Sequence, residues 1–220
     1  MGPQLTPVPG KRRAMVGGLN PFKRNVLVEE ILIQCALAEQ HYGAVSALLA
    51  DFDTRQSRYV WAHIHAFLTH MAMVSKMVSS PNAHRSPTAR ARGEALVSAL
   101  NIDSSSVIFD RNARNNVEHL DERLDLWIES DSHTLLEVVL DNRSAFDFMT
   151  ESRPMPGSTA FVRRVLIQDA MIFITQGRSG FEEIDLKAAA SEISDLKSRA
   201  NAFLTGDTSV ERVRPGRIPF

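Results

Sequence analysis

Apolar residues recur at steps of three and four along the first third of the chain, which is the period of a helix that buries one face. Between Asn25 and Asp51 the pattern consists of Val28, Ile31, Leu32, Cys35, Leu37, Ala38, Val45, Leu48 and Leu49. A second periodic stretch begins near the cap candidates Asp53 and Thr54 and stops before Pro81. Two long helices joined by a short turn predict a helical hairpin.

Further elements follow at shorter spacing. Helices are expected over Thr88–Leu100 and over about Ser105–Glu129, and a last one over 185–204 with Gly206 in the stop position. Between them the strings LLEVVLD, SAFDFMT, FVRRVLI and MIFIT are rich in β-branched and aromatic residues, which favours short antiparallel strands. The tetrapeptide Gly177-Arg178-Ser179-Gly180 is typical of a hairpin turn.

These elements predict a mainly α fold, a helical bundle with a small antiparallel β element near the C-terminus. We divide the chain into a flexible basic arm over 1–24, one domain over 25–204 with a β-rich insertion at about 131–177, and a tail over 205–220. The arm carries a charge of +5 and the tail +1, so the net charge of -1 leaves -7 for the domain. The arms could touch phosphates or fold back on the acidic body.

Composition narrows the class of protein. With 44% hydrophobic and 23% charged residues, the chain is unlike disordered, collagenous or membrane-embedded proteins. Its net charge of -1 excludes a strongly basic duplex binder, so any contact with nucleic acid has to be local. Cys35 has no second thiol for a disulfide, and we find no signal peptide or membrane-spanning run, so a cytoplasmic location is expected.

The expected fourth helix has two distinct faces when its residues are spaced at about 100°. The apolar stripe consists of Ala113, Val117, Leu120, Leu124, Trp127 and Ile128. The polar face consists of Arg111, Arg114, Asn115, Glu118, His119, Glu122 and Asp125. One interpretation is a solvated surface on which Arg114 pairs with Glu118 at i,i+4 spacing.

The other interpretation is a site for phosphodiester chemistry. Arg114 could hold phosphate oxygens with its guanidinium fork, and His119 could transfer a proton near neutral pH. Asn115 lies four residues before His119, where its amide could orient the imidazole, and Arg111 and Glu118 would complete the substrate-facing surface. These groups suffice for RNA cleavage without a metal, because the RNA supplies its own 2′-hydroxyl nucleophile.

Arg114, followed by Asn115 and then by His119 after four intervening residues, resembles the R-x4-6-H signature of the HEPN superfamily. The resemblance covers roughly residues 25–130. It implies a helical, metal-independent endoribonuclease that acts as a toxin or defence protein. It also implies RNA or a nucleotide as ligand, an antitoxin protein as a further partner, and a homodimer in which the motifs of two chains meet.

The sequence leaves room for a metal site and for a function without catalysis. His63, His65 and His70 suggest a metal site, but His65 points away from the other two on a helix and no cysteine or carboxylate pair accompanies them, so we expect no metal and no cofactor. Some HEPN proteins bind without cleaving. The alternative function is therefore a non-catalytic helical module that binds a nucleotide or a protein partner.

Overall fold

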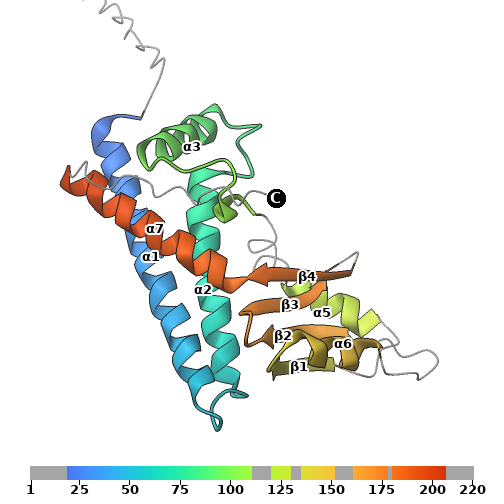
Figure 1. Cartoon of the computed structure of the whole chain (residues 1–220). Coiled ribbons are helices and arrows are strands. Elements are labelled where there is room, and N and C mark those ends of the chain that lie inside the picture. The colour runs from blue at the N-terminus through green and yellow to red at the C-terminus, as the bar shows by residue number, and fades with distance from the viewer. Residues whose placement is uncertain (1–18, 111–119, 130–134, 152–160, 178–179, 207–220) are drawn as a thin grey trace, which may run out of the picture.

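A computed structural model describes residues 19–110, 120–129, 135–151, 161–177 and 180–206. In this part of the chain the fold is mainly α. Two long antiparallel helices, α1 (Pro21–Ala50) and α2 (Arg58–Val78), form the predicted hairpin, and α7 (Leu186–Thr205) packs across it (Figure 1). The shorter α3 (Pro87–Ala99) covers the end of the hairpin where α1 begins. None of the described helices is long and apolar enough to cross a membrane.

Local hydrogen bonds explain where the hairpin helices begin and end. Asn20 caps α1 by accepting the N–H of Phe22 at 2.8 Å, and Pro21 occupies the first helical position. The expected caps of the second helix, Asp53 and Thr54, lie instead in the turn, where Thr54 donates its hydroxyl to the carbonyl of Leu48 at 2.9 Å. The second helix therefore begins at Arg58, a few residues later than predicted.

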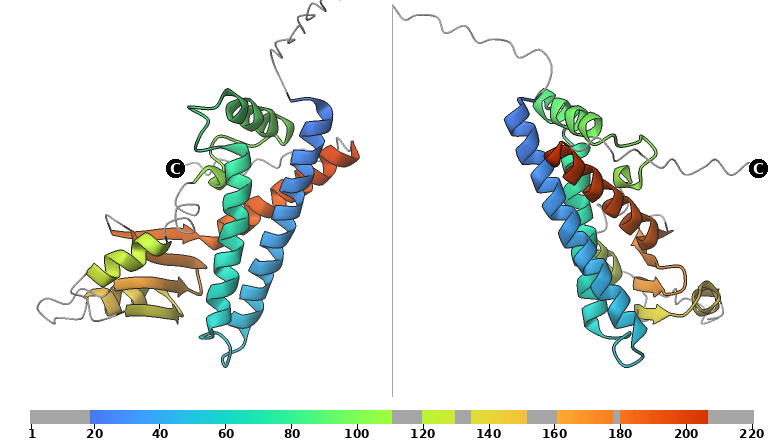
Figure 2. Two further views of the ribbon diagram at one scale, coloured as in Figure 1. Left: turned by 180° about the vertical axis from the view of Figure 1, so that it is seen from behind. Right: turned by 60° about the vertical axis from the view of Figure 1, so that its left-hand side comes forward.

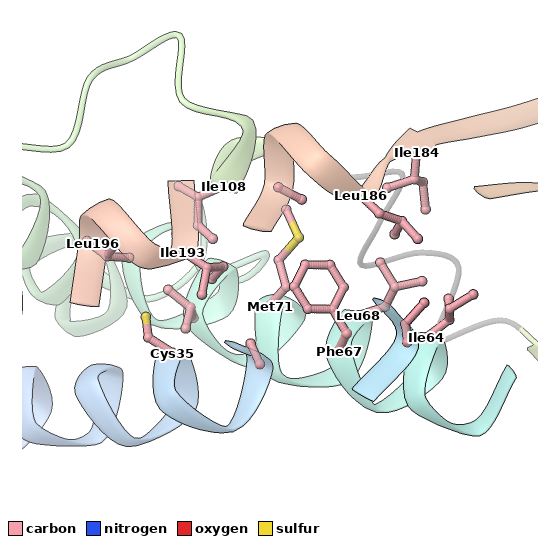
Figure 3. Close-up of a cluster of buried hydrophobic side chains, with 14 of the residues drawn as sticks. Cys35, Ile64, Phe67, Leu68, Met71, Ile108, Ile184, Leu186, Ile193 and Leu196 are labelled. Carbon is pink, nitrogen blue, oxygen red and sulfur yellow. The ribbon is translucent and has the colours of Figure 1, made fainter. Parts of the chain in front are cut away.

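The main hydrophobic core lies where the hairpin, α7 and the end of the sheet meet. Figure 3 shows side chains from all of these elements in one cluster, among them Cys35 of α1, Phe67 and Met71 of α2, and Ile193 of α7. Burial raises the pKa of the Cys35 thiol to about 12, with Glu39 contributing a smaller increase. The cysteine is thus an inert core residue, as its place on the apolar face of the first helix indicates.

A four-stranded sheet extends from the hairpin, in the order β1 (Leu135–Leu140), β2 (Phe161–Ile167), β3 (Ile172–Gly177) and β4 (Gly180–Asp185). The antiparallel expectation holds for β2 and β3, and Gly177 pairs with Gly180 in the predicted hairpin. The second strand of that hairpin, β4, lies beyond the predicted end of the β-rich insertion at about 177. The antiparallel expectation is wrong for β1, which pairs with β2 in parallel. The sheet is therefore mixed. Parallel pairing of β1 and β2 requires a crossover connection between them.

The crossover contains α6 (Arg143–Glu151), at the place where the sequence predicts a strand from SAFDFMT. Asn142 caps this helix by accepting the N–H of Ala145 at 3.1 Å, and Arg143 pairs with Asp147 one turn later at 3.0 Å. Phe146 is buried while Phe148 is 70% exposed. The strand was predicted from the aromatic residues, whereas the cap and the ion pair favour a helix.

Each face of the sheet packs against different helices. Leu166 and Phe173 belong to the main core, whereas Val165, Ile167 and Ile174 pack around Phe146 of α6 in a second cluster. Figures 1 and 2 show α5 (Leu120–Glu129) and α6 on opposite faces of the sheet. The sheet is therefore the middle layer of this half of the molecule.

The single helix expected over Ser105–Glu129 is not formed over its first part. Val107–Phe109 form a 3-10 turn, η1, and Asp110 is extended with φ -64° and ψ 123°. Two local bonds compete with an α-helix here: Asp103 accepts the N–H of Ser105 at 2.9 Å, and Ser106 accepts that of Ile108 at 3.2 Å. The expected apolar stripe is also wrong at Ile128, which is 71% exposed.

Candidate functional site

The motif residues predicted as the site are Arg111, Arg114, Asn115, Glu118 and His119. They lie outside the described residues, so their mutual geometry stays a prediction. What the structure places is the chain on either side of them: η1 ends at Phe109, and α5 begins at Leu120.

The approach to the motif is firmly anchored. Ile108 of η1 is fully buried in the main core, and Figure 3 draws it in the same cluster as Met71 of α2 and Ile193 of α7. Arg199 of α7 donates to the carbonyl of Asn101 at 2.9 Å and so holds the segment before η1. Asp110, the last described residue before the motif, is exposed. The described chain therefore reaches the surface at Asp110, directly after a segment fixed to α2 and α7.

A row of polar side chains runs along the hairpin, and we name it the histidine row: Gln34 and His41 of α1 with His63 and His70 of α2. Nδ1 of His41 lies 2.9 Å from Nδ1 of His63, and Nδ1 of His70 lies 2.7 Å from Oε1 of Gln34. The His41 and His70 rings stack with centroids 5.6 Å apart. Gln34 in turn donates to Glu30 at 2.7 Å. The row therefore connects both helices through a continuous polar chain.

The protonation chemistry of the row follows from these contacts. Burial lowers the pKa of His41, and the neighbouring His63 and His70 lower it further. Burial also lowers the pKa of His70. Because a hydrogen bond between two ring nitrogens needs one N–H and one lone pair, His41 and His63 cannot both carry a proton on Nδ1 while bonded. The row can therefore hold or pass a proton, and it favours the neutral forms of His41 and His70.

Metal binding was the other use that these histidines suggested. His65 indeed points away from His63 and His70: its ring meets the edge of Phe173, with centroids 6.4 Å apart. Among the residues that the structure describes, no group of three or more His, Cys, Asp and Glu side chains could hold a metal ion.

A second polar cluster ties the sheet together. Nη2 of Arg164 donates to Glu137 at 3.0 Å, and its Nε lies 3.0 Å from the other oxygen of that carboxylate. Arg163 donates to the same carboxylate at 2.9 Å. The guanidinium of Arg164 also lies 5.5 Å from the ring centroid of Trp61 on α2. The cluster joins β1, β2 and α2, and these contacts give it a structural role.

Sequence reasoning missed His41 and Gln34 as partners of the α2 histidines. A signal was present, because Gln34 and His41 are seven residues apart and so are His63 and His70. In an antiparallel hairpin such pairs face each other in order, with 34 opposite 70 and 41 opposite 63.

Comparison of the chain with protein-family models, with curated proteins and with solved structures finds no match.

Proposed function

We propose that this protein is a metal-independent endoribonuclease of HEPN type, a toxin or defence protein that acts in the cytoplasm. The single observation that carries the proposal is the string of Arg114, Asn115 and His119 in the sequence. The mainly α fold of the described residues agrees with the helical fold that this resemblance implies. The anchored η1 turn supports it too, because a catalytic segment needs a fixed approach.

Each motif residue has a role in this mechanism. The 2′-hydroxyl of the substrate attacks the adjacent phosphorus while His119 takes its proton, and the bond from phosphorus to the 5′-oxygen breaks as that oxygen gains a proton. Arg114 neutralises the phosphate oxygens, and Asn115 orients the imidazole of His119. Arg111 and Glu118 line the substrate side of the same face. The products are a 2′,3′-cyclic phosphate and a free 5′-hydroxyl.

Assembly belongs to the same proposal. One motif supplies one imidazole, whereas this reaction benefits from both a base and an acid, which two chains related by a twofold axis could supply together. The proposed partners are therefore RNA, a second copy of the chain, and an antitoxin protein.

The test is cleavage of an unstructured RNA in EDTA. Wild type should cut, whereas His119→Ala and Arg114→Ala should each lose about 100-fold or more in rate, as is typical when a proton-transfer or charge-stabilising group is removed. Lys187→Ala removes an exposed cation from α7 and should cut at the wild-type rate. RNA or nucleotide binding without any cleavage by wild type would instead support the non-catalytic module.

A further inference from the structure

The charges of the chain are strongly segregated. From Thr54 to Gly93, a run of 40 residues, there is no Asp or Glu, and Arg55, Arg58, Lys76, Arg85, Arg90 and Arg92 give a charge of +6. The domain over 25–204 carries -7, so the remainder of the domain carries -13. The run corresponds to the turn after α1, to α2 and to the first half of α3. Such a contrast between a basic layer and an acidic body creates a local positive field.

Among the described residues, the arginines of α3 bond to backbone carbonyls. Arg92 donates to the carbonyls of Met77 at 3.2 Å and Lys76 at 3.0 Å, and Arg90 donates to the carbonyl of Ala83 at 3.2 Å. In the described part of the chain, neither guanidinium pairs with a carboxylate. Arg85 is exposed on the loop before α3. At the other end of α2 the situation differs, since Arg55 is paired with Asp141 at 2.7 Å.

The first turn of α1 adds to the same end of the molecule. Figures 1 and 2 show the start of α1 beside α3, and the two helices are in contact. Lys23 is exposed there, and the neighbouring Phe22 is 74% exposed. We define the α3 surface as Phe22, Lys23, Arg85, Arg90 and Arg92. It combines cations that bind phosphates with an aromatic ring that can stack on a base.

We infer that the α3 surface is the docking site for the backbone of single-stranded RNA, an inference that rests on the proposed function. The exposed Lys23 and Arg85 bind phosphates, Arg90 and Arg92 add positive charge behind them, and Phe22 stacks on an unpaired base. In the sequence, η1 follows α3 and leads directly into the motif, and η1 packs against α2 and α7.

The loop before α3 argues against a lipid surface as the partner. Its residues, SSPNAHRS over 79–86, include no large apolar side chain that could enter a bilayer. Single-stranded RNA, which is recognised by cations together with stacking, fits these residues better.

The experiment measures binding apart from cleavage. A fluorescein-labelled unstructured RNA of about 20 nucleotides is titrated with His119→Ala protein in EDTA at several KCl concentrations, and anisotropy gives Kd. Adding Lys23→Gln and Arg85→Gln to this background should weaken binding several-fold and lower the slope of log K against log salt by about 0.7 for each charge. Phe22→Ala should weaken binding about tenfold. Lys187→Gln is the matched control, an exposed cation on α7 whose loss should leave Kd unchanged.

Three results would overturn the inference. The first is a Kd and salt slope for the α3 variants equal to those of the control, and the second is an equal loss in the control, which would reflect net charge only. The third is binding of vesicles containing phosphatidylserine in place of RNA. The binding measurement is independent of the proposed function. Weaker binding by the α3 variants would support this surface even if His119→Ala left cleavage unchanged. Loss of cleavage without weaker binding would not support it.

Discussion

The Nδ1 atoms of His41 and His63 lie 2.9 Å apart across the α1–α2 hairpin, so one ring donates an N–H to the other between helices that also meet through the His70–Gln34 bond and apolar contacts. The stacked ring of His70 brings a third titratable group to His41, and Glu30 reaches the row through Gln34. A cluster of this kind is stable while its histidines are neutral.

Stability should therefore fall in weak acid. The pKa values of His41 and His70 are lowered in the folded protein, so the unfolded chain binds more protons as the pH drops through the ordinary histidine pKa of 6.5. The stabilising contribution is fully present above that value and is lost as the pH falls toward the lowered pKa values. Urea unfolding at about pH 7.5 and about pH 5.5 should show a lower free energy of unfolding at the acidic pH.

His41→Gln tests the origin of this effect. The variant should lose part of the difference between the two pH values, because its side chain does not titrate. His84→Gln is the control, since His84 is an exposed loop residue that contacts the carbonyl of Pro81. An unchanged pH difference in His41→Gln would assign the acid sensitivity to other groups.

Gln56 fastens the hairpin turn to the edge of the sheet. Its amide donates to the carbonyl of Val139 at 2.7 Å and accepts the N–H of Val139 at 3.0 Å, as a neighbouring strand would. Gln56→Ala should lower the free energy of unfolding by about 1 to 2 kcal/mol, because both backbone groups of β1 lose a partner. Gln56→Glu should also destabilise, since a carboxylate cannot donate to the carbonyl. Urea unfolding measures both.

Gln40→Ala is the matched control for this pair of bonds. Gln40 is exposed on α1, and its truncation should change the free energy of unfolding by less than about 0.5 kcal/mol. Hydrogen exchange at the amide of Val139 gives a local readout, and it should become faster in Gln56→Ala only. Equal protection of this amide in Gln56→Ala and wild type would contradict the edge contact.

Gly93 allows α3 to lie directly on the last turn of α2. A Cβ at this position would lie 2.5 Å from the carbonyl oxygen of Val78, so Gly93→Ala forces the helices apart and should cost about 1 to 3 kcal/mol of unfolding free energy. Gly43→Ala meets nothing within 4 Å on α1 and should stabilise by about 0.5 to 1 kcal/mol, because alanine favours a helix interior. Thermal unfolding of the two variants should therefore shift Tm in opposite directions.

How much of the fold was predictable depended on the strength of local patterns. Long helices with a regular apolar period, such as α1 and α7, were predicted nearly to their ends, and Gly206 does end α7 with a left-handed φ of 72°. The strand predicted at Phe146 and Phe148 was wrong, because two aromatic residues outweighed the cap and the ion pair that favour a helix. The wrong antiparallel expectation for β1 followed from that error, because the missed helix belongs to the crossover that allows β1 and β2 to pair in parallel.

The described polar site was less predictable than the fold. The histidine row needs residues from both arms of the hairpin, and only the observed turn over 51–57 sets Gln34 opposite His70 and His41 opposite His63. The partner of Gln56 lies 83 residues away along the chain, beyond any local pattern. Arg114 and His119, in contrast, were singled out from spacing alone, and their arrangement stays a prediction.

The proposed dimer makes the catalytic residues separable in a mixing experiment. Suppose that each half-site takes Arg114 from one chain and His119 from the other. A heterodimer of an Arg114→Ala chain with a His119→Ala chain then has one half-site with both substitutions and one half-site with neither. If the two residues instead come from the same chain, every half-site in the heterodimer lacks one of them.

Mixed in equal amounts under conditions that exchange subunits, the two inactive variants should recover part of the wild-type rate and at most about a quarter, because half of the dimers are mixed, each has one half-site with both residues, and a mixed dimer holds a single His119 imidazole. Cleavage of unstructured RNA in EDTA is the measurement, with exchange followed by native mass spectrometry. Each variant mixed with itself is the control and should stay inactive. Full exchange without recovered activity would contradict the shared half-site, and 5′-phosphate products or strict dependence on magnesium would contradict attack by the 2′-hydroxyl.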